Sequence, residues 1–315
     1  MRFKQIQFFQ LTDSFDDSIH HLVECLEKLL FKPCLPSMPI SMGWVPLIDE
    51  EGAPLTRCIN HCTLFCLQIE EKILPTTVIR QSLTEKIKQI EKAENRKIRQ
   101  KEKFSLKDEI IMTLLPRAFS KLTRVYAYID SKNHSLILGT TNVNKAEQFL
   151  STFKKSLSAE IDSFHLKKLS SIMTHWLKEK SYPSSFSVEK TCLLQDPQQQ
   201  NRVIRCQQQD LFAGSIQALI KDGCEVKQLA LLWQDQVHFI LTDDFSLRSI
   251  QFQEDVRMSI KEREPETALQ QLDADFAITA MILSGLLKEL LGLFIKQKSQ
   301  KTLKTSEMYE RVTMN

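Results

Sequence analysis

Glycine is scarce in this chain of 315 residues: there are seven, and no two lie closer together than seven positions. A dinucleotide-binding fingerprint and a Walker A loop both need glycines a few residues apart, because the backbone must approach the phosphates closely. Neither motif is present, and the sequence also lacks an HExxH zinc motif and a G-x-S-x-G nucleophile elbow. We therefore expect a protein without a cofactor, without a bound metal and without enzyme activity.

The N-terminus alternates polar and apolar residues and lacks the continuous apolar segment of a secretion signal. We therefore expect a cytoplasmic protein whose eight cysteines are reduced. Cys58, His61, Cys62 and Cys66 lie within nine residues and have no second ligand pair further on, which favours buried thiols over a zinc site. If this segment is one strand, its three cysteines share a face and His61 points away.

One long apolar run, residues 276–294, has the length of a short membrane span but contains Lys288 and Glu289. These charges favour a buried core helix, and we expect no association with a membrane. Asp273 and Asp275 precede the run, where the N-terminus of that helix is expected.

The hydrophobic pattern predicts an α+β fold, with mixed antiparallel sheets, packed helices and a projecting helical hairpin. We expect an α+β body over residues 1–74, a helical arm over 75–122, a second α+β body over 123–295 and a polar, basic tail over 296–315. A repeated pattern of hairpin and helix suggests two related halves within the second body. A turn is expected at Gly43–Pro46, and a helix capped by Asp13 or Ser14 follows the first strand. Strands are predicted at residues 3–11, 62–69, 125–129, 136–139, 229–233, 237–241 and 247–252, and a further helix at 145–157.

The arm is predicted from a change in the pattern of apolar and charged residues at Pro75. Val78, Ile79, Leu83, Ile87 and Ile90 recur at steps of three and four residues, and cations fill other positions, which is typical of a long amphipathic helix. Ser105 and Asp108 have the spacing of a capping box for a second helix. Pro116 is expected to end that helix.

Charge is concentrated in this arm. Residues 80–124 contain thirteen Lys and Arg against six Asp and Glu, although the whole chain carries a net charge of only +3. One interpretation is a solvated charged helix or a coiled-coil arm that never touches DNA; the other is an arm that binds phosphates. No aromatic residue lies between Arg80 and Lys103, which disfavours base stacking and favours contact with a nucleic-acid backbone.

A hypothesis from another class is a metal-dependent nuclease that uses Asp243, Asp244, Asp273 and Asp275 to hold Mg²⁺. The first pair is expected in a hairpin turn and the second at a helix N-terminus, where aspartate is common for reasons of backbone structure. Structural roles are therefore favoured for all four carboxylates.

Ordered blocks over residues 1–295 resemble the bacterial RdgC family of recombination-associated proteins. The blocks are Met42–Pro46, Glu70–Pro75, Ser105–Glu109, Leu114–Ser120, Val203–Arg205, Gln209–Leu211, Lys227–Leu231 with Trp233, and Asp273–Phe276. The resemblance implies a ring-shaped homodimer with a positively charged hole, through which duplex DNA passes with little sequence preference. It also implies a cytoplasmic, nucleoid-associated protein that restrains strand exchange by RecA.

The resemblance also implies roles for individual residues. Phe119 would enter the partner subunit, with Leu115 and Pro116 at the same interface, while Arg117 and Lys227 would face DNA. The full set of expected DNA contacts is Lys97, Arg99, Lys101, Arg117, Lys121, Arg202, Arg205, Gln208, Gln209 and Lys227. Where the family can carry two lysines, this chain has Gln207 and Gln208, which should flatten the salt dependence of binding if those positions contact phosphate.

Overall fold

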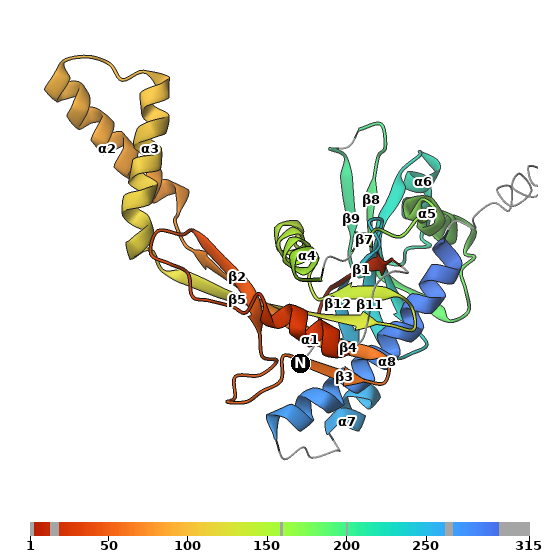
Figure 1. The fold of residues 1–315 in the computed structure, drawn as a ribbon. Coiled ribbons are helices and arrows are strands. Elements are labelled where there is room, and N and C mark those ends of the chain that lie inside the picture. The colour runs from red at the N-terminus through yellow and green to blue at the C-terminus, as the bar shows by residue number, and fades with distance from the viewer. Residues whose placement is uncertain (1–2, 13–18, 158–159, 200, 262–266, 296–315) are drawn as a thin grey trace, which may run out of the picture. The chain divides into compact units, whose positions relative to one another are not determined.

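The structure is a computed structural model that describes residues 3–12, 19–157, 160–199, 201–261 and 267–295 (Figure 1). Its two compact units are each assembled from segments that are distant in sequence. Of the described residues, the arm unit contains 9–12, 19–157, 160–161 and 267–277, and the second unit contains 3–8, 162–199, 201–261 and 278–295. Strand β1 (Ile6–Leu11) and helix α8 (Ala268–Phe294) therefore contribute residues to both units. The expected α+β class with antiparallel strand pairing is confirmed.

The sheet of the arm unit is organised around two long strands, β4 and β5, that pair along their whole length from Cys62↔Asp130 to Lys72↔Ser120. Strand β2 borders β4 on one side and β6 borders β5 on the other, while the short β3 also pairs with β4. The bounds are β2 Ile40–Val45, β3 Thr56–Ile59, β4 Cys62–Lys72, β5 Ser120–Asp130, β6 Ser135–Leu138 and, at the junction of the units, β7 Ile161–Asp162.

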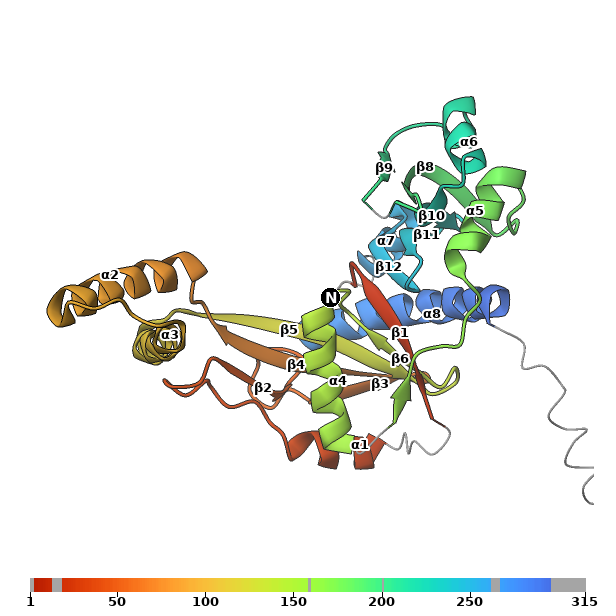
Figure 2. The same cartoon turned by 90° about the horizontal axis from the view of Figure 1, so that it is seen from above.

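An aromatic cluster forms the core of the arm unit, where helix α4 (Val143–Leu157) covers one face of this sheet (Figure 2). Trp44, Phe65, Phe149 and Phe153 are almost completely buried, and their ring centroids lie 5.5–6.4 Å apart. The indole Nε1 of Trp44 donates a hydrogen bond of 2.8 Å to Ser156 Oγ, so the polar edge of this buried ring is satisfied. Helix α1 (Ile19–Glu27) adds Leu22 and Leu26 to the core; its expected cap, Asp13 or Ser14, lies outside the described residues.

The expected turn at Gly43–Pro46 is wrong, because residues 40–45 form strand β2. Gly43 is in that strand for a tertiary reason. A Cβ atom at this position would lie 2.3 Å from Phe31 Cα and 2.4 Å from Phe31 N. The backbone of residues 29–31 hydrogen bonds to Trp44 on both sides, with Trp44 N–H donating to Leu29 O and Phe31 N–H donating to Trp44 O. Only glycine permits this close approach of two backbones.

The second unit contains a sheet with the strand order β12-β11-β10-β8-β9, and residues 6 and 7 of β1 pair with β12. Residues 234–236 form the turn between β10 and β11, in which Gln234 and Asp235 both have positive φ and Gln236 N–H donates to Trp233 O. The strands are β8 Phe186–Gln195, β9 Val203–Cys206, β10 Glu225–Trp233, β11 Val237–Thr242 and β12 Ser246–Phe252; the helices are α5 Leu169–Glu179, α6 Gly214–Lys221 and α7 Glu254–Lys261.

Helix α8 confirms the expected buried apolar helix. Leu283, Leu286, Leu287 and Leu290 are fully buried in the second unit. Glu289 interrupts the apolar run, and its carboxylate accepts hydrogen bonds from Trp233 Nε1 and from the Ser185 hydroxyl, which satisfies its oxygens inside the protein. By length and composition alone, α8 is also the one helix in the described part of the chain that would suffice to cross a membrane.

The predicted arm is formed by α2 (Thr76–Glu94) and α3 (Gln100–Leu114), followed by one 3₁₀ turn, η1 (Leu115–Arg117). The predicted capping box at Ser105 and Asp108 is wrong, because α3 begins at Gln100, five residues before Ser105. Ser105 lies inside the helix and its hydroxyl donates to Lys101 O. The residue that closes the N-terminus is Glu102, whose carboxylate accepts a hydrogen bond from Arg99 N–H at 2.9 Å.

The close backbone approach at Gly43 predicts that Gly43→Ala will lower the free energy of unfolding by about 1–3 kcal/mol, the usual cost of overpacking. Gly292→Ala is the matched control, because nothing lies within 4 Å of its Cβ position and it is in helix α8, where alanine is favoured by roughly 0.5–1 kcal/mol. Urea denaturation measures both. A Gly43→Ala protein as stable as the parent would contradict this account of strand β2.

Candidate nucleic-acid interface

The arm continues the β4–β5 ladder directly. Beyond the last register pair, Lys72↔Ser120, Ile73 N–H donates a hydrogen bond of 2.7 Å to Phe119 O. Pro75 precedes helix α2 and Pro116 lies in η1, so a proline marks each junction between the ladder and the arm. The two helices are therefore attached to a paired backbone, which limits their movement relative to these strands.

Polar contacts and one buried apolar side chain connect the two helices of the arm. Helix α2 ends at Asn95, which has a left-handed backbone conformation with φ of 50°. Ile98 in the connection is buried, and its N–H donates to Glu91 Oε1 at 3.0 Å. Lower in the arm, Lys86 Nζ binds Glu109 Oε1 at 2.6 Å and joins α2 to α3.

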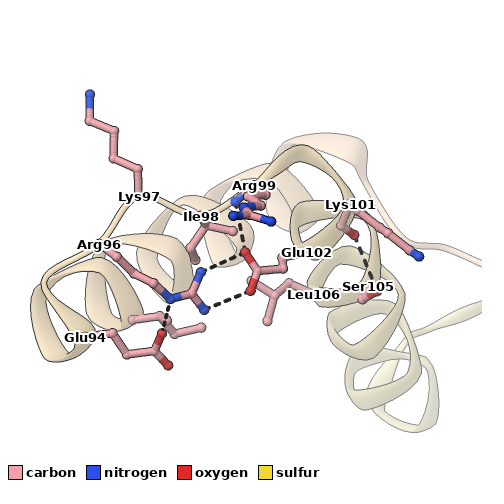
Figure 3. Close-up of a pocket in the computed structure, with 10 residues that line it drawn as sticks. Glu94, Arg96, Lys97, Ile98, Arg99, Lys101, Glu102, Ser105 and Leu106 are labelled. Atoms are coloured by element: carbon pink, nitrogen blue, oxygen red, sulfur yellow. Dashed lines mark hydrogen bonds and ion pairs between the residues drawn. The ribbon is translucent and has the colours of Figure 1, made fainter.

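Arg96 is at the centre of the tip (Figure 3). Its Nη1 and Nη2 atoms bind the two carboxylate oxygens of Glu102 at 2.9 and 2.8 Å, while its Nε donates to Glu94 Oε2 at 2.6 Å. One guanidinium thus connects the end of α2 with the first turn of α3. Hydrogen bonds from Arg96 and from Arg99 N–H lower the pKa of Glu102 to about 2.

These contacts use four of the six acids between residues 80 and 124 and leave most of the cations without an ion-pair partner in the described chain. Of the thirteen Lys and Arg between residues 80 and 124, only Lys86, Arg96 and Arg124 form ion pairs within the part of the chain that the structure describes. Arg124 pairs with Asp49, outside the arm. Ten cations therefore have no ion-pair partner there: Arg80, Lys88, Lys92, Lys97, Arg99, Lys101, Lys103, Lys107, Arg117 and Lys121.

Three predicted DNA contacts gather at the tip. Lys97, Arg99 and Lys101 are exposed and border an open concavity that also includes Ile90, Ile98 and Leu106. Figure 3 shows the Lys97 and Lys101 side chains extending away from the Arg96–Glu102 bridge, in different directions. These cations were expected from the sequence, but the Arg96–Glu102 bridge was not. The short spacing of Glu94, Arg96 and Glu102 around the helix connection is the sequence feature that could have predicted the bridge.

The predicted interface residues lie at the base of the arm. Leu115 is buried and anchors η1, whereas Pro116, Arg117 and Lys121 are exposed. Phe119 is 86 % exposed, more than any other large hydrophobic residue in the described part of the chain. Two further exposed side chains on α3, Phe104 at 61 % and Met112 at 65 %, were not singled out from the sequence. Their spacing of eight residues places them on one face of the helix.

The remaining predicted DNA contacts lie in the second unit. Lys227 Nζ is 3.0 Å from Asp243 Oδ2 and 3.7 Å from Glu225 Oε2, so a phosphate would compete there with two carboxylates. Arg202 pairs with Asp196 at 3.4 Å. Arg205, on strand β9, is exposed and forms no ion pair within the described chain. Gln208 and Gln209 are also exposed, and Gln209 N–H donates to Lys190 O.

The four aspartates of the nuclease hypothesis have structural partners. Asp243 binds Lys227, and Asp244 accepts hydrogen bonds from the hydroxyls of Thr242 and Ser246, as expected of a turn. The expected position of Asp273 at a helix N-terminus is wrong, because α8 begins at Ala268; Asp273 instead receives two hydrogen bonds from Arg57, at 2.8 and 2.6 Å. Asp275, in the same helix, accepts a hydrogen bond from Gln271.

A metal site is likewise not found in the described residues, where no group of three His, Cys, Asp or Glu side chains is placed to hold an ion. Cys58 and Cys62 lie on the two strands of a β3–β4 hairpin and not on a single strand. Cys62 and Cys66 are buried, whereas Cys58 and His61 are exposed. The expectation of buried thiols is therefore confirmed for two of the three cysteines.

Comparison with known proteins agrees with the resemblance noted from the sequence. The family model described as "Putative exonuclease, RdgC" matches residues 1–297. The chain belongs to the RdgC family. Curated relatives named recombination-associated protein RdgC include those of Psychromonas ingrahamii (34 % identity; 95 % of this chain and 100 % of the relative), Aeromonas hydrophila (34 %; 88 % and 92 %) and Yersinia enterocolitica (33 %; 92 % and 96 %).

These matches extend over both units and include the arm of this RdgC-family chain. The region from Lys298 onward lies outside the family match. The predicted basic tail over residues 296–315 also lies outside the described residues. The arm and the exposed residues at its base are thus features of the part of the chain that the family model covers.

The bridge at the tip predicts an unusually acidic Glu102. Its pKa in the folded chain, about 2, lies below the ordinary value of about 4.3 for an unfolded chain, so its contribution to stability is complete above the ordinary value and is lost as the pH falls towards 2. Arg96→Gln should raise the pKa of Glu102 towards the ordinary range. A carboxyl-carbon NMR titration measures the shift.

Lys97→Gln is the control for this titration, because it removes a neighbouring positive charge that makes no hydrogen bond to Glu102. It should leave the pKa of Glu102 almost unchanged. Equal shifts in the two variants would show that general charge, and not the Arg96 hydrogen bonds, sets the value.

Proposed function

We propose that this RdgC-family chain is a double-stranded DNA-binding protein that contacts the phosphate backbone with little sequence preference. The observation that carries the proposal is the charge of residues 80–124, where ten cations lack an ion-pair partner in the described chain while four of the six acids hold the arm together. An ordinary solvated helix balances its charges in pairs between neighbouring turns. An unbalanced row of cations instead binds phosphates and releases counterions.

The same arm supports backbone contact over base reading. Its exposed cations are spread along two helices joined by a tight tip, and the sequence contains no helix-turn-helix element to enter a groove. Lys and Arg contacts to phosphate position a protein on a duplex but carry no sequence information. We therefore propose Lys97, Arg99, Lys101, Arg117 and Lys121 as the main contacts of the arm.

In the second unit, Arg205 is the stronger candidate contact because its guanidinium is exposed and unpaired within the described chain, whereas Lys227 and Arg202 are held by carboxylates. Gln207, Gln208 and Gln209 are neutral and would add no counterion release. We therefore propose that the arm contributes more of the electrostatic affinity for DNA than the second unit does.

We further propose that the protein acts as a homodimer that closes into a ring around duplex DNA, with Phe119 as an anchor in the partner subunit. Phe119 is 86 % exposed three residues after Pro116, and its carbonyl accepts a hydrogen bond from Ile73 N–H, so a large aromatic side chain extends from a paired backbone as an interface anchor would. In the cell, a ring on the nucleoid in the cytoplasm would obstruct strand exchange by RecA simply by occupying the duplex.

The alternative activity is a metal-dependent nuclease, which the description of the family model as an exonuclease favours. The partners of Asp243, Asp244 and Asp273 support a role in structure instead. A gel-shift assay with end-labelled duplex, with and without Mg²⁺, distinguishes the two. A clamp binds without metal and leaves the DNA intact, whereas degradation that requires Mg²⁺ would overturn our proposal.

Charge reversal in the arm should weaken binding to duplexes of any sequence. Arg117→Glu and Lys101→Glu should each lower the affinity by a similar factor for unrelated sequences, and each lost phosphate contact should reduce the slope of log K against log salt by about 0.9. Fluorescence anisotropy at several salt concentrations measures both quantities. Lys132→Glu is the matched control, because Lys132 is an exposed lysine in the β5–β6 turn, at the end of β5 away from the arm. A loss confined to one DNA sequence, or an equal loss in the control, would contradict backbone contact.

Replacing Phe119 tests the ring. Because its side chain is almost fully exposed in one chain, Phe119→Ser should leave the thermal unfolding temperature of the monomer unchanged and remove an anchor of the dimer. Retention on closed circular DNA should then fall more than affinity for a short linear duplex. Phe104→Ser removes another exposed phenylalanine from the arm and should not produce this difference. Equal effects of Phe119→Ser on circular and linear DNA would count against enclosure.

A further inference from the structure

Two cysteines of the second unit face each other across the β8–β9 hairpin. Cys192 on β8 and Cys206 on β9 are direct register partners in this antiparallel pair. Both side chains are buried, with 3 % and 4 % exposure, and the neighbouring Cys206 thiol contributes to the raised pKa of Cys192. Both are free thiols in this structure.

Register partners of this kind have the separation that a disulfide needs. Directly opposed residues of antiparallel strands have Cα atoms about 4.5 or 5.5 Å apart, depending on the type of pair. A disulfide accepts Cα separations of about 4.4–6.8 Å. The backbone separation of such register partners is therefore compatible with the bond. The third cysteine of this unit, Cys224, precedes β10 and is not a register partner of either residue.

We propose that Cys192 and Cys206 form a redox-sensitive dithiol that closes to a disulfide when it meets a small-molecule disulfide, and that this bond fixes the edge strand β9 to β8. One cysteine, as thiolate, attacks a sulfur of the small disulfide and forms a mixed disulfide, releasing one small thiol. The second cysteine then attacks the protein sulfur of that mixed disulfide and releases the second small thiol. Two electrons and two protons pass from the cysteine pair to the oxidant.

Burial makes the reaction depend on opening of the strand. Loss of solvent raises the pKa of the Cys192 thiol to about 12, so the reactive thiolate is scarce while β9 is paired. Strand β9 has only four residues and lies at the end of the strand order of this sheet, so it has few hydrogen bonds to break. Opening exposes both thiols, and closing after oxidation locks the hairpin.

The consequence concerns the residues that β9 carries. Arg205 is on this strand and Arg202 directly precedes it. A cross-link at Cys206 restricts both arginines; any effect on DNA binding rests on the proposed function, whereas the cross-link itself does not.

The experiment uses the full chain, incubated with oxidised glutathione and quenched with acid. The expected result is a loss of the mass of two hydrogens, a peptide map that joins Cys192 to Cys206, and slower amide exchange in residues 203–206, all reversed by dithiothreitol. Cys224→Ser should behave as the parent, because that cysteine takes no part. Cys206→Ser should give no such link and should accumulate a glutathione adduct at Cys192 instead.

The parent chain in urea provides the reference for reactivity, since its thiols are all accessible. A native chain that forms no Cys192–Cys206 peptide under conditions where the unfolded chain forms mixed disulfides would overturn the proposal. So would a link that leaves amide exchange of β9 unchanged. DNA affinity is measured separately on the oxidised chain, so failure of the DNA proposal leaves the result on the thiols interpretable.

Discussion

The β4–β5 ladder is the constraint on which the arm unit depends. Its register runs without a shift from Cys62↔Asp130 to Lys72↔Ser120, so one end of the ladder lies in the aromatic core and the other carries the arm. At the arm end, the buried carboxylate of Glu70 accepts a hydrogen bond from Cys34 N–H at 2.8 Å, and contacts with Cys34 and Ser120 lower its pKa. A slip by one residue would turn every side chain of these strands to the wrong face. The position of Phe119 at the base of the arm is thus determined by packing at the opposite end of β5.

The acids and the cations of the arm have different roles. The acids at the tip hold backbone N–H groups and one arginine, as Glu91 does with Ile98 and Glu102 does with Arg96 and Arg99. Of the cations in α2, α3 and their connection, only Lys86 and Arg96 form ion pairs within the described chain. Exposed ion pairs contribute little to stability, so a cationic surface of this kind costs little in the folded chain and is available to a polyanion.

The sequence predicts what depends on local pattern. The predicted strands β5, β10 and β11 and the periodicity of α2 all appear in the structure; β11 has nearly its expected bounds, whereas β5 and β10 begin five and four residues earlier than expected. The failures have non-local causes. Gly43 looked like a turn residue because the backbone of Phe31, twelve residues away, cannot be inferred from its neighbours. Asp273 looked like a cap, but its partner Arg57 lies on a strand far away in sequence. Ser105 and Asp108 have the spacing of a capping box, but α3 begins earlier and Glu102 caps its N-terminus by accepting a hydrogen bond from Arg99 N–H.

The candidate site also has one part that the sequence predicts and one that depends on tertiary contacts. The excess of cations in the arm is a property of composition, and the sequence alone suffices to find it. Which cations are free is a property of tertiary contacts. Lys227 and Arg205 are both basic residues, and the sequence does not distinguish them. In the structure, Lys227 forms ion pairs with two carboxylates, whereas Arg205 forms none in the described chain. A phosphate that approaches Lys227 must displace Asp243 or Glu225, whereas a phosphate at the arm displaces only water and counterions. If the chain binds DNA as proposed, the arm therefore contributes most of the salt-dependent affinity, and the second unit contributes chiefly through Arg205.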